Sequence, residues 1–151
     1  MELVITLLVV VALIGLAVFL IQKARAATQA ALVVYNEILQ PYLACVRDSA
    51  LEEAYRATSA SYQRETPLER YLGAYQSRFA ELGPLQRWDN MRSGQEKDLI
   101  SGSAFFTYTL DLHFSKQVPR VVFYIDVKAS PRRIHATFTK HSSRSMTPEV
   151  W

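Results

Sequence analysis

The chain has 151 residues, of which 50% are hydrophobic and 21% are charged, and its formal net charge is +3. This length has room for one domain, and a domain of this size can bury a stable core without disulfides or a metal ion. The single cysteine, Cys45, excludes an intrachain disulfide, and its place in an apolar helical pattern favours a buried, unreactive thiol.

The first predicted element is an uncharged, apolar segment from Leu3 to Ile21. Fifteen of its 19 residues are Leu, Ile, Val or Phe, and as a helix it would span about 28 Å, close to the hydrocarbon thickness of a bilayer. These side chains favour insertion by roughly 5 to 9 kcal/mol. The segment lacks the polar face that a helix of a soluble core would have. We therefore predict that residues 1–25 form a single-pass transmembrane anchor, with the lipid bilayer as its first partner.

The ends of this segment bear on processing and orientation. Ala24-Arg25-Ala26 matches the cleavage pattern of a signal peptide, but Met1-Glu2 is not a basic n-region and the apolar run is long for that function. Lys23 and Arg25 follow the segment, whereas Glu2 and the terminal amine precede it. The positive-inside rule then favours a domain on the cytoplasmic side.

Apolar residues at helical spacing continue beyond the anchor and predict further helices. The first runs from Ala26 to Val46, and Pro41 should bend or interrupt it because proline lacks a backbone N–H. The second begins near Ser49, since Ser49 and Glu52 have the spacing of a capping box.

A third helix begins at Thr66-Pro67, and Gly83-Pro84 ends it. The apolar period then changes from 3.6 to 2, which indicates β-strands. Four strands are predicted, at residues 85–92, 106–114, 121–128 and 134–139. No helix-length segment separates them, so they should form an antiparallel meander with helices covering one face. The expected class is α+β, with helices packed on a curved four-stranded antiparallel sheet, a domain at residues 26–140 and a polar tail at residues 141–151.

Three segments carry a resemblance to a known family: LEEAYRATS at 51–59 with Tyr62, PLERY at 67–71, and LGPL at 82–85. They resemble the second helix, the third helix and the glycine before the sheet in the nuclear transport factor 2-like family, which has the cystatin-like cone fold. The likeness covers about residues 28–140 and is closest to small bacterial members of unknown function. Several members are membrane-anchored assembly or docking parts. The resemblance therefore implies a single-pass protein of the bacterial inner (cytoplasmic) membrane.

The sequence offers no motif for catalysis, for a cofactor or for a metal. Four polar strand residues are out of phase with the apolar positions and should point away from the interior: Asp111, His113, Asp126 and His135. Enzymes with a cone fold place an acid and a tyrosine inside it, and here Tyr75 and Tyr108 are the candidate cavity-lining residues. No cysteine or carboxylate completes a convincing metal set with the histidines. We expect a protein that is not an enzyme.

The C-terminal part of the chain is basic. Residues 116–151 have a net charge of +5, whereas residues 1–115 have a net charge of −2. Such a surface can face lipid headgroups or an acidic partner, and it can also be a solvated sheet edge. The candidate partner-binding residues are Lys128, Arg132, Arg133, Lys140 and Trp151. Nucleic acid is disfavoured as a partner, because no aromatic residues are interleaved with the Arg pair.

The expected function is that of a membrane-anchored interaction or assembly module, an accessory subunit of a membrane protein complex. Its expected partner is a protein of that complex or a second copy of the chain in a homo-oligomer. Anchoring favours this interpretation because confinement to a surface raises the effective concentration of weak partners. One alternative is a small-ligand-binding or isomerase-type protein that uses the cone cavity. The other is an exported component of a secretion system or of the cell envelope.

Overall fold

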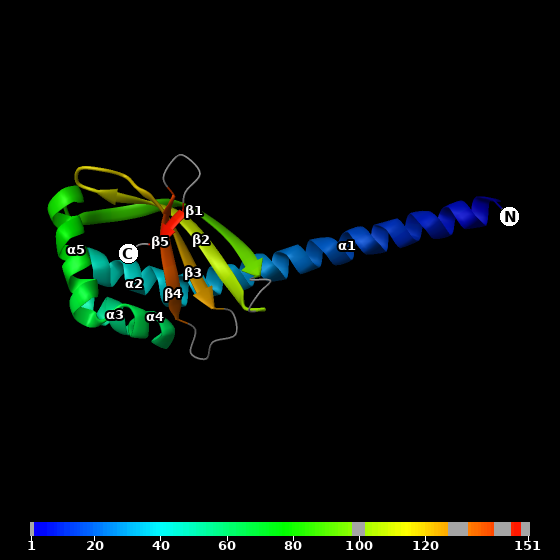
Figure 1. The fold of residues 1–151 in the computed structure, drawn as a ribbon. Helices are drawn as coiled ribbons and strands as arrows, with labels where there is room; N and C mark the ends of the chain where they lie inside the picture. The colour runs from blue at the N-terminus through cyan, green and yellow to red at the C-terminus, as the bar shows by residue number, and fades with distance from the viewer. Residues whose placement is uncertain (1, 98–101, 127–132, 141–145, 149–151) are drawn as a thin grey trace. The chain divides into compact units, whose positions relative to one another are not determined.

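The structure is a computed structural model that describes residues 2–97, 102–126, 133–140 and 146–148 (Figure 1). The chain divides into two compact units, Met1–Val33 and Val34–Trp151. The sequence places the start of the domain at residue 26, a few residues before this division. The α+β class is confirmed: a long apolar helix comes first, and further helices and an antiparallel sheet follow.

The first helix, α1 (Glu2–Val34), contains the predicted anchor. It is the one helix among the described residues that is long and apolar enough to cross a membrane, and no part of its most apolar window is buried. A long apolar helix in the core of a soluble protein would be mostly buried. The predicted apolar helix at the N-terminus is therefore confirmed in length and in composition.

The interruption predicted at Pro41 takes the form of a wide helical turn. A π-helical turn, η1 (Tyr35–Leu39), lies directly before α2 (Gln40–Arg47), in which Pro41 is near the first position. Proline has no N–H to donate, and its ring would clash with the carbonyl of Glu37 four residues earlier in a regular α-helix. Widening the turn relieves this clash without breaking the helix.

The capping box predicted at Ser49 and Glu52 is wrong. Ser49 has a left-handed backbone with φ of 61° and ends α2, and the N–H of Ala50 donates to the carbonyl of Cys45 at 2.8 Å. The next helix, α3 (Leu51–Arg56), has Ala50 at its N-cap and no side-chain cap. Ser49, which was expected to cap the following helix, is instead part of the hydrogen-bonded turn that ends α2.

The stretch predicted as the second helix forms two short helices, because α4 (Ala60–Glu65) follows α3 as a separate element. Ser59 caps α4, and its hydroxyl accepts a hydrogen bond from the N–H of Tyr62 at 3.2 Å. Between the two helices, Thr58 forms an isolated parallel bridge with Ile134. This bridge ties the helical layer to the sheet.

The third predicted helix is confirmed as α5 (Leu68–Leu82), with Pro67 at its N-cap. Gly83 ends it with φ of 81°, a conformation that glycine adopts without strain. A Cβ atom on Gly83 would also overlap the Ser115 side chain. Glycine is needed here both for its backbone and for the close approach of the chain after β2.

The sheet has its strands in sequence order, and every neighbouring pair is antiparallel. The strands are β1 (Leu85–Lys97), β2 (Ala104–Phe114), β3 (Arg120–Asp126), β4 (Ile134–Lys140) and β5 (Met146–Pro148). The antiparallel meander is as predicted, but the number of strands is not confirmed. The short strand β5 lies within residues 141–148, which the sequence predicts to belong to a polar tail.

The core lies on one face of the sheet. Alternate residues of β2, from Phe106 to Phe114, are 4% exposed or less, as their period of two predicts. The helices contribute three tyrosines, and the Tyr42 hydroxyl is 2.8 Å from that of Tyr75 and 3.1 Å from that of Tyr71. Burial is the largest cause that raises the pKa of all three phenols. These tyrosines are therefore neutral, and their hydroxyl groups form hydrogen bonds with one another inside the core.

Candidate functional site

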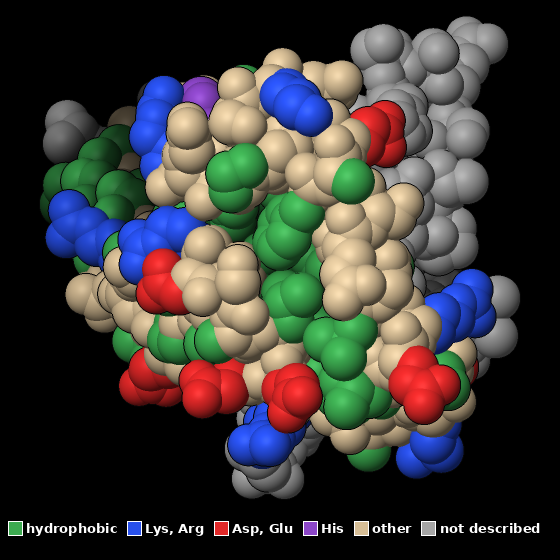
Figure 2. Space-filling view, turned by 90° about the vertical axis from the view of Figure 1, so that its left-hand side faces the viewer, with side chains coloured by type: hydrophobic (Ala, Val, Ile, Leu, Met, Phe, Trp, Pro, Cys, Tyr) green, Lys and Arg blue, Asp and Glu red, His purple; other side chains and the backbone are tan. Residues whose placement is uncertain are grey.

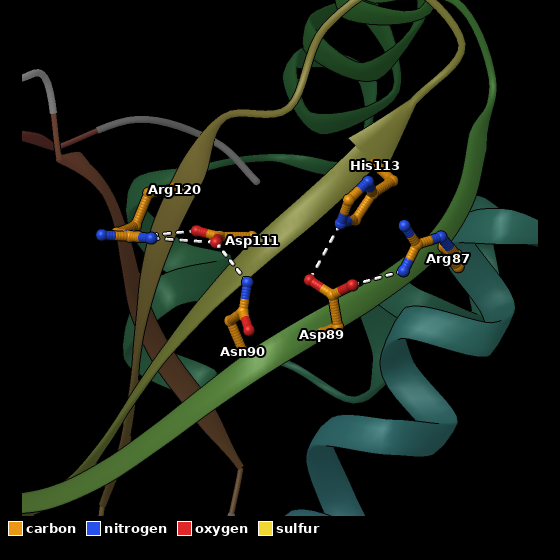
Figure 3. A network of polar contacts seen from close by, with 6 residues as sticks. All are labelled: Arg87, Asp89, Asn90, Asp111, His113 and Arg120. Carbon is orange, nitrogen blue, oxygen red and sulfur yellow. Dashed lines mark hydrogen bonds and ion pairs between the residues drawn. The ribbon is translucent and has the colours of Figure 1, made fainter.

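The polar residues of β2 lie on the sheet face opposite the core. Asp111 and His113 alternate with the buried apolar residues, as the sequence predicts, and they pair with polar residues of β1 and β3. Figure 3 shows that the side chains form two neighbouring clusters across these strands. This row of six residues, called the polar row below, consists of Arg87, Asp89, Asn90, Asp111, His113 and Arg120.

The first cluster is built around Asp111, whose side chain is only 12% exposed. Arg120 lies opposite it on β3 and binds both carboxylate oxygens, with Nε at 2.6 Å from Oδ1 and Nη2 at 2.9 Å from Oδ2. The side-chain amide of Asn90 donates a third hydrogen bond to Oδ2 at 2.9 Å. These bonds, with that from Arg120 the strongest, lower the pKa of Asp111 to about 2.

Asn90 reaches Asp111 because β1 has an irregularity at this point. The register shifts between Asp89 and Arg92, so β1 carries one more residue here than β2. Asn90 has φ of 53°, which asparagine tolerates better than most residues. A bulge of this kind turns a side chain away from the regular alternation. The Asp-Asn pair inside a strand is the sequence signal for this bulge, and the strand predicted at residues 85–92 does not include a bulge.

The second cluster is built around Asp89. Nε2 of His113 lies 2.8 Å from Oδ1 of Asp89, and Arg87 pairs with the other carboxylate oxygen. The hydrogen bond from His113 is the main cause that lowers the pKa of Asp89, and Arg87 adds to it. His113 is placed by its cross-strand pairing with Arg87. The two carboxylate oxygens of Asp89 are therefore bound by side chains from two different strands.

The two carboxylates of the polar row lie directly opposite each other. Asp89 pairs with Asp111 across β1 and β2, an arrangement of like charges that would destabilise the sheet if nothing compensated it. Here each carboxylate has its own arginine and a further hydrogen-bond donor. Both acids are therefore ionised near neutral pH and hydrogen-bonded.

The chemistry of the polar row favours binding. The carboxyl groups of Asp89 and Asp111 have lowered pKa values and form ion pairs with arginine side chains. Both acids are therefore poor proton donors. The outward-facing groups are guanidinium groups, since the side chains of Arg87 and Arg120 are 63% and 50% exposed. Among the described residues, no group of three His, Cys, Asp or Glu residues could hold a metal ion.

The candidate partner-binding residues from the basic part of the chain are mostly beyond what the structure describes. Lys128, Arg132 and Trp151 lie outside the described residues, and Lys140 is described only as part of the β4 backbone. The side chain of Arg133 is defined: its Nη1 donates to the carbonyl of Arg56 at 2.5 Å. The guanidinium group of Arg133 thus binds a backbone carbonyl at the end of α3.

The two candidate cavity-lining tyrosines are both buried. Tyr75 is 2% exposed, bonds to the Tyr42 hydroxyl and packs with its ring 4.8 Å from that of Tyr71. Tyr108 is fully buried, and its ring lies 6.1 Å from that of Tyr35. Both rings therefore belong to the aromatic packing of the core.

The surface formed around α5 shows hydrophobic side chains in the middle and acidic side chains along one edge (Figure 2). In the second unit, Val118 is the only large hydrophobic residue among those described that is strongly exposed, at 52%. The hydrophobic area in this view is thus made of partly covered side chains. It does not have the character of a large apolar docking patch.

No family model matches the chain, and neither a curated protein nor a solved structure matches it closely enough to show a relationship.

Proposed function

We propose that the chain is a single-pass membrane protein whose α+β domain is an interaction or assembly module. The observation that carries this proposal is the exposure of α1. Fourteen large hydrophobic side chains between Val4 and Ile21 are 45% to 64% exposed, and they lie on every side of the helix. An apolar surface of this kind is unfavourable in water and favourable in the hydrocarbon core of a bilayer.

The charges next to the span support an orientation. Lys23 and Arg25 follow the apolar segment, and Glu2 precedes it. By the positive-inside rule this asymmetry favours a domain on the cytoplasmic side of a bacterial inner membrane. The order of the domain, helices first and an antiparallel meander second, agrees with a nuclear transport factor 2-like cone, and that assignment is part of the proposal.

The polar row supports binding over catalysis. The acids Asp89 and Asp111 are ionised and held by cations, and the exposed groups beside them are guanidiniums. Arginine is frequent in protein interfaces because its planar group forms several directed hydrogen bonds. The function that follows is a docking subunit of a membrane complex, held close to its partner by the anchor.

The anchor is tested by fractionating cells that express the full chain. We expect the protein in the membrane pellet after a wash with alkaline carbonate, with its N-terminal segment retained. A matched control replaces Leu13 and Ile14 by Lys, which opposes insertion. Recovery of the wild-type chain from the soluble fraction with a new N-terminus near Ala27 would show a cleaved signal peptide and overturn the proposal.

The interaction role is tested by affinity purification from detergent-solubilised native membranes. We expect a membrane protein partner that is lost when Lys128 and Arg132 are both replaced by Glu. Arg70→Glu is the matched control, because Arg70 is an exposed residue of α5 away from the basic part of the sequence. Equal recovery of the partner with both variants would exclude the basic residues as its binding site.

A reporter fused to the C-terminus would report which side of the membrane the domain faces.

A further inference from the structure

The strand β1 is the outermost strand at one end of the sheet (Figure 1). Its inner edge pairs with β2, and no described strand pairs with its outer edge. The outer edge of a terminal strand presents backbone N–H and C=O groups that can pair with another strand. Proteins usually protect such edges against pairing with another chain. The part of β1 that has no bulge is therefore a candidate site for pairing with a further strand.

The bulges that protect β1 are confined to its first half. Register shifts occur between Leu85 and Arg87 and between Asp89 and Arg92, and such bulges hinder the addition of a further strand. From Arg92 to Lys97 the pairing with β2 is regular, and all six residues are exposed. Six residues are the usual length of a β-strand. This second half of β1, the open edge, is therefore long enough to pair with another strand.

The open edge has a symmetric pattern of charge. Arg92 and Glu96 lie two residues before and two residues after Gly94. All three share one face of the sheet, because they pair with alternate residues of β2, namely Thr109, Thr107 and Phe105. In an antiparallel pair of identical strands centred on Gly94, Arg92 of each copy would lie opposite Glu96 of the other. The twofold axis would generate two such ion pairs.

The neighbours of these residues leave the charges available. Among the described residues the side chain of Arg92 has no ion pair or hydrogen bond. Glu96 lies beside the hydroxyl of Tyr124 and raises the pKa of that phenol, after the larger effect of burial. A carboxylate can accept several hydrogen bonds, so Glu96 can keep this contact and still bind an arginine. Gly94 has no side chain, which keeps the centre of the pattern free.

We propose that the open edge of β1, Arg92 to Lys97, binds the same segment of a second copy of this chain in antiparallel register about Gly94. The two sheets would then join into one continuous sheet. This inference extends the proposed function, because it names one partner of the anchored domain. A monomeric chain in the membrane fraction would overturn the pairing alone, and a chain cleaved near Ala27 would overturn the anchor alone.

The charge pattern allows a test by exchange of charges. The full chain is expressed with two different affinity tags, solubilised in detergent, and one tag is used to recover the other. We expect wild-type copies to co-purify, and we expect Arg92→Glu alone and Glu96→Arg alone each to reduce co-purification about tenfold, since both like-charged contacts are repulsive. When the two single variants are expressed together, each mixed dimer regains two opposite-charge contacts and co-purification should return.

The register is tested by cross-linking. In the proposed register Ser93 of one copy lies opposite Gln95 of the other, so copies carrying Ser93→Cys and Gln95→Cys should form a disulfide with each other under mild oxidation. Cys45 is replaced by Ala in every variant. Gln86→Cys, in the bulged half of β1, is the control and should remain monomeric.

The outcomes separate clearly. Rescue in the mixed pair together with the 93–95 cross-link supports the proposal. Equal co-purification of all the variants, failure of the mixed pair to recover, or a cross-link of residue 93 to a different protein overturns it. Circular dichroism of each variant shows whether it is folded, and the mixed pair keeps the test valid even if one single variant is less stable.

Discussion

Asp111 and Arg120 lie directly opposite each other on β2 and β3, and their side chains form a two-point ion pair with distances of 2.6 and 2.9 Å. The carboxylate is almost covered, whereas half of the arginine side chain remains in contact with water. The pair therefore joins a buried acceptor to a solvated donor, and its contribution to stability is partly screened.

Replacing Asp111 by Asn tests this pair. The variant loses the charge and leaves Arg120 without its partner, and because water screens the arginine we expect the free energy of unfolding to fall by about 1 kcal/mol. Urea denaturation of the full chain in detergent measures the change. Glu81→Gln, an exposed change on α5, is the control and should alter the value by less than half as much.

Asp111 also predicts how stability depends on pH. Its folded pKa, about 2, lies below the ordinary value of 3.8, so the unfolded state takes up protons first as the pH falls. The stabilisation is complete above about pH 4 and is lost as the pH falls towards 2. Urea midpoints measured from pH 5 to pH 2 should therefore decline less steeply for Asp111→Asn than for the wild type. Parallel curves would contradict this role of Asp111.

The buried tyrosines predict an unequal cost of losing a hydroxyl. Tyr42 bonds to both Tyr71 and Tyr75, so Tyr42→Phe leaves two buried hydroxyls without this partner and should cost about 2 kcal/mol. Tyr75→Phe leaves Tyr42 bonded to Tyr71 and should cost less. Thermal unfolding of the two variants measures the order, and a larger loss for Tyr75→Phe would contradict it.

Replacing the glycine within α5 and the glycine at its end by alanine should change the stability of the domain in opposite directions. Gly83 has φ of 81° and no room for a Cβ atom, so Gly83→Ala should destabilise the domain by about 1 to 3 kcal/mol. Gly73 is within α5, and a Cβ atom there meets nothing within 4 Å. Gly73→Ala should therefore stabilise the domain by about 0.5 to 1 kcal/mol, since alanine favours helix. Denaturation of both variants under one set of conditions checks the two signs.

The sequence predicts the elements best where one local signal is strong. The alternation from Phe106 to Phe114 identifies β2, and Gly83 identifies the end of α5. It fails at Ser49, where a valid capping pattern is overridden by the way α2 ends. The strand β5 was also missed, because three residues are too few for a period to appear.

The polar row is predictable only in part. The alternation places Asp111 and His113 on the face away from the core, because that depends on β2 alone. Their partners Asn90 and Asp89 depend on the register between β1 and β2, and that register contains a one-residue shift. A sequence does not show such a shift unless its turn chemistry is recognised.

The wide turn before Pro41 has a consequence for how this stretch of chain tolerates length changes. Val34 and Leu39 are both fully buried although they are five residues apart, a spacing that a regular α-helix would place on different sides. The turn η1 absorbs one surplus residue, and the apolar side chains on either side of it stay in phase. Removal of a single exposed residue, such as Asn36, would keep the same side chains facing the core, but it would also return the turn to the regular pitch and bring the ring of Pro41 against the carbonyl of Glu37.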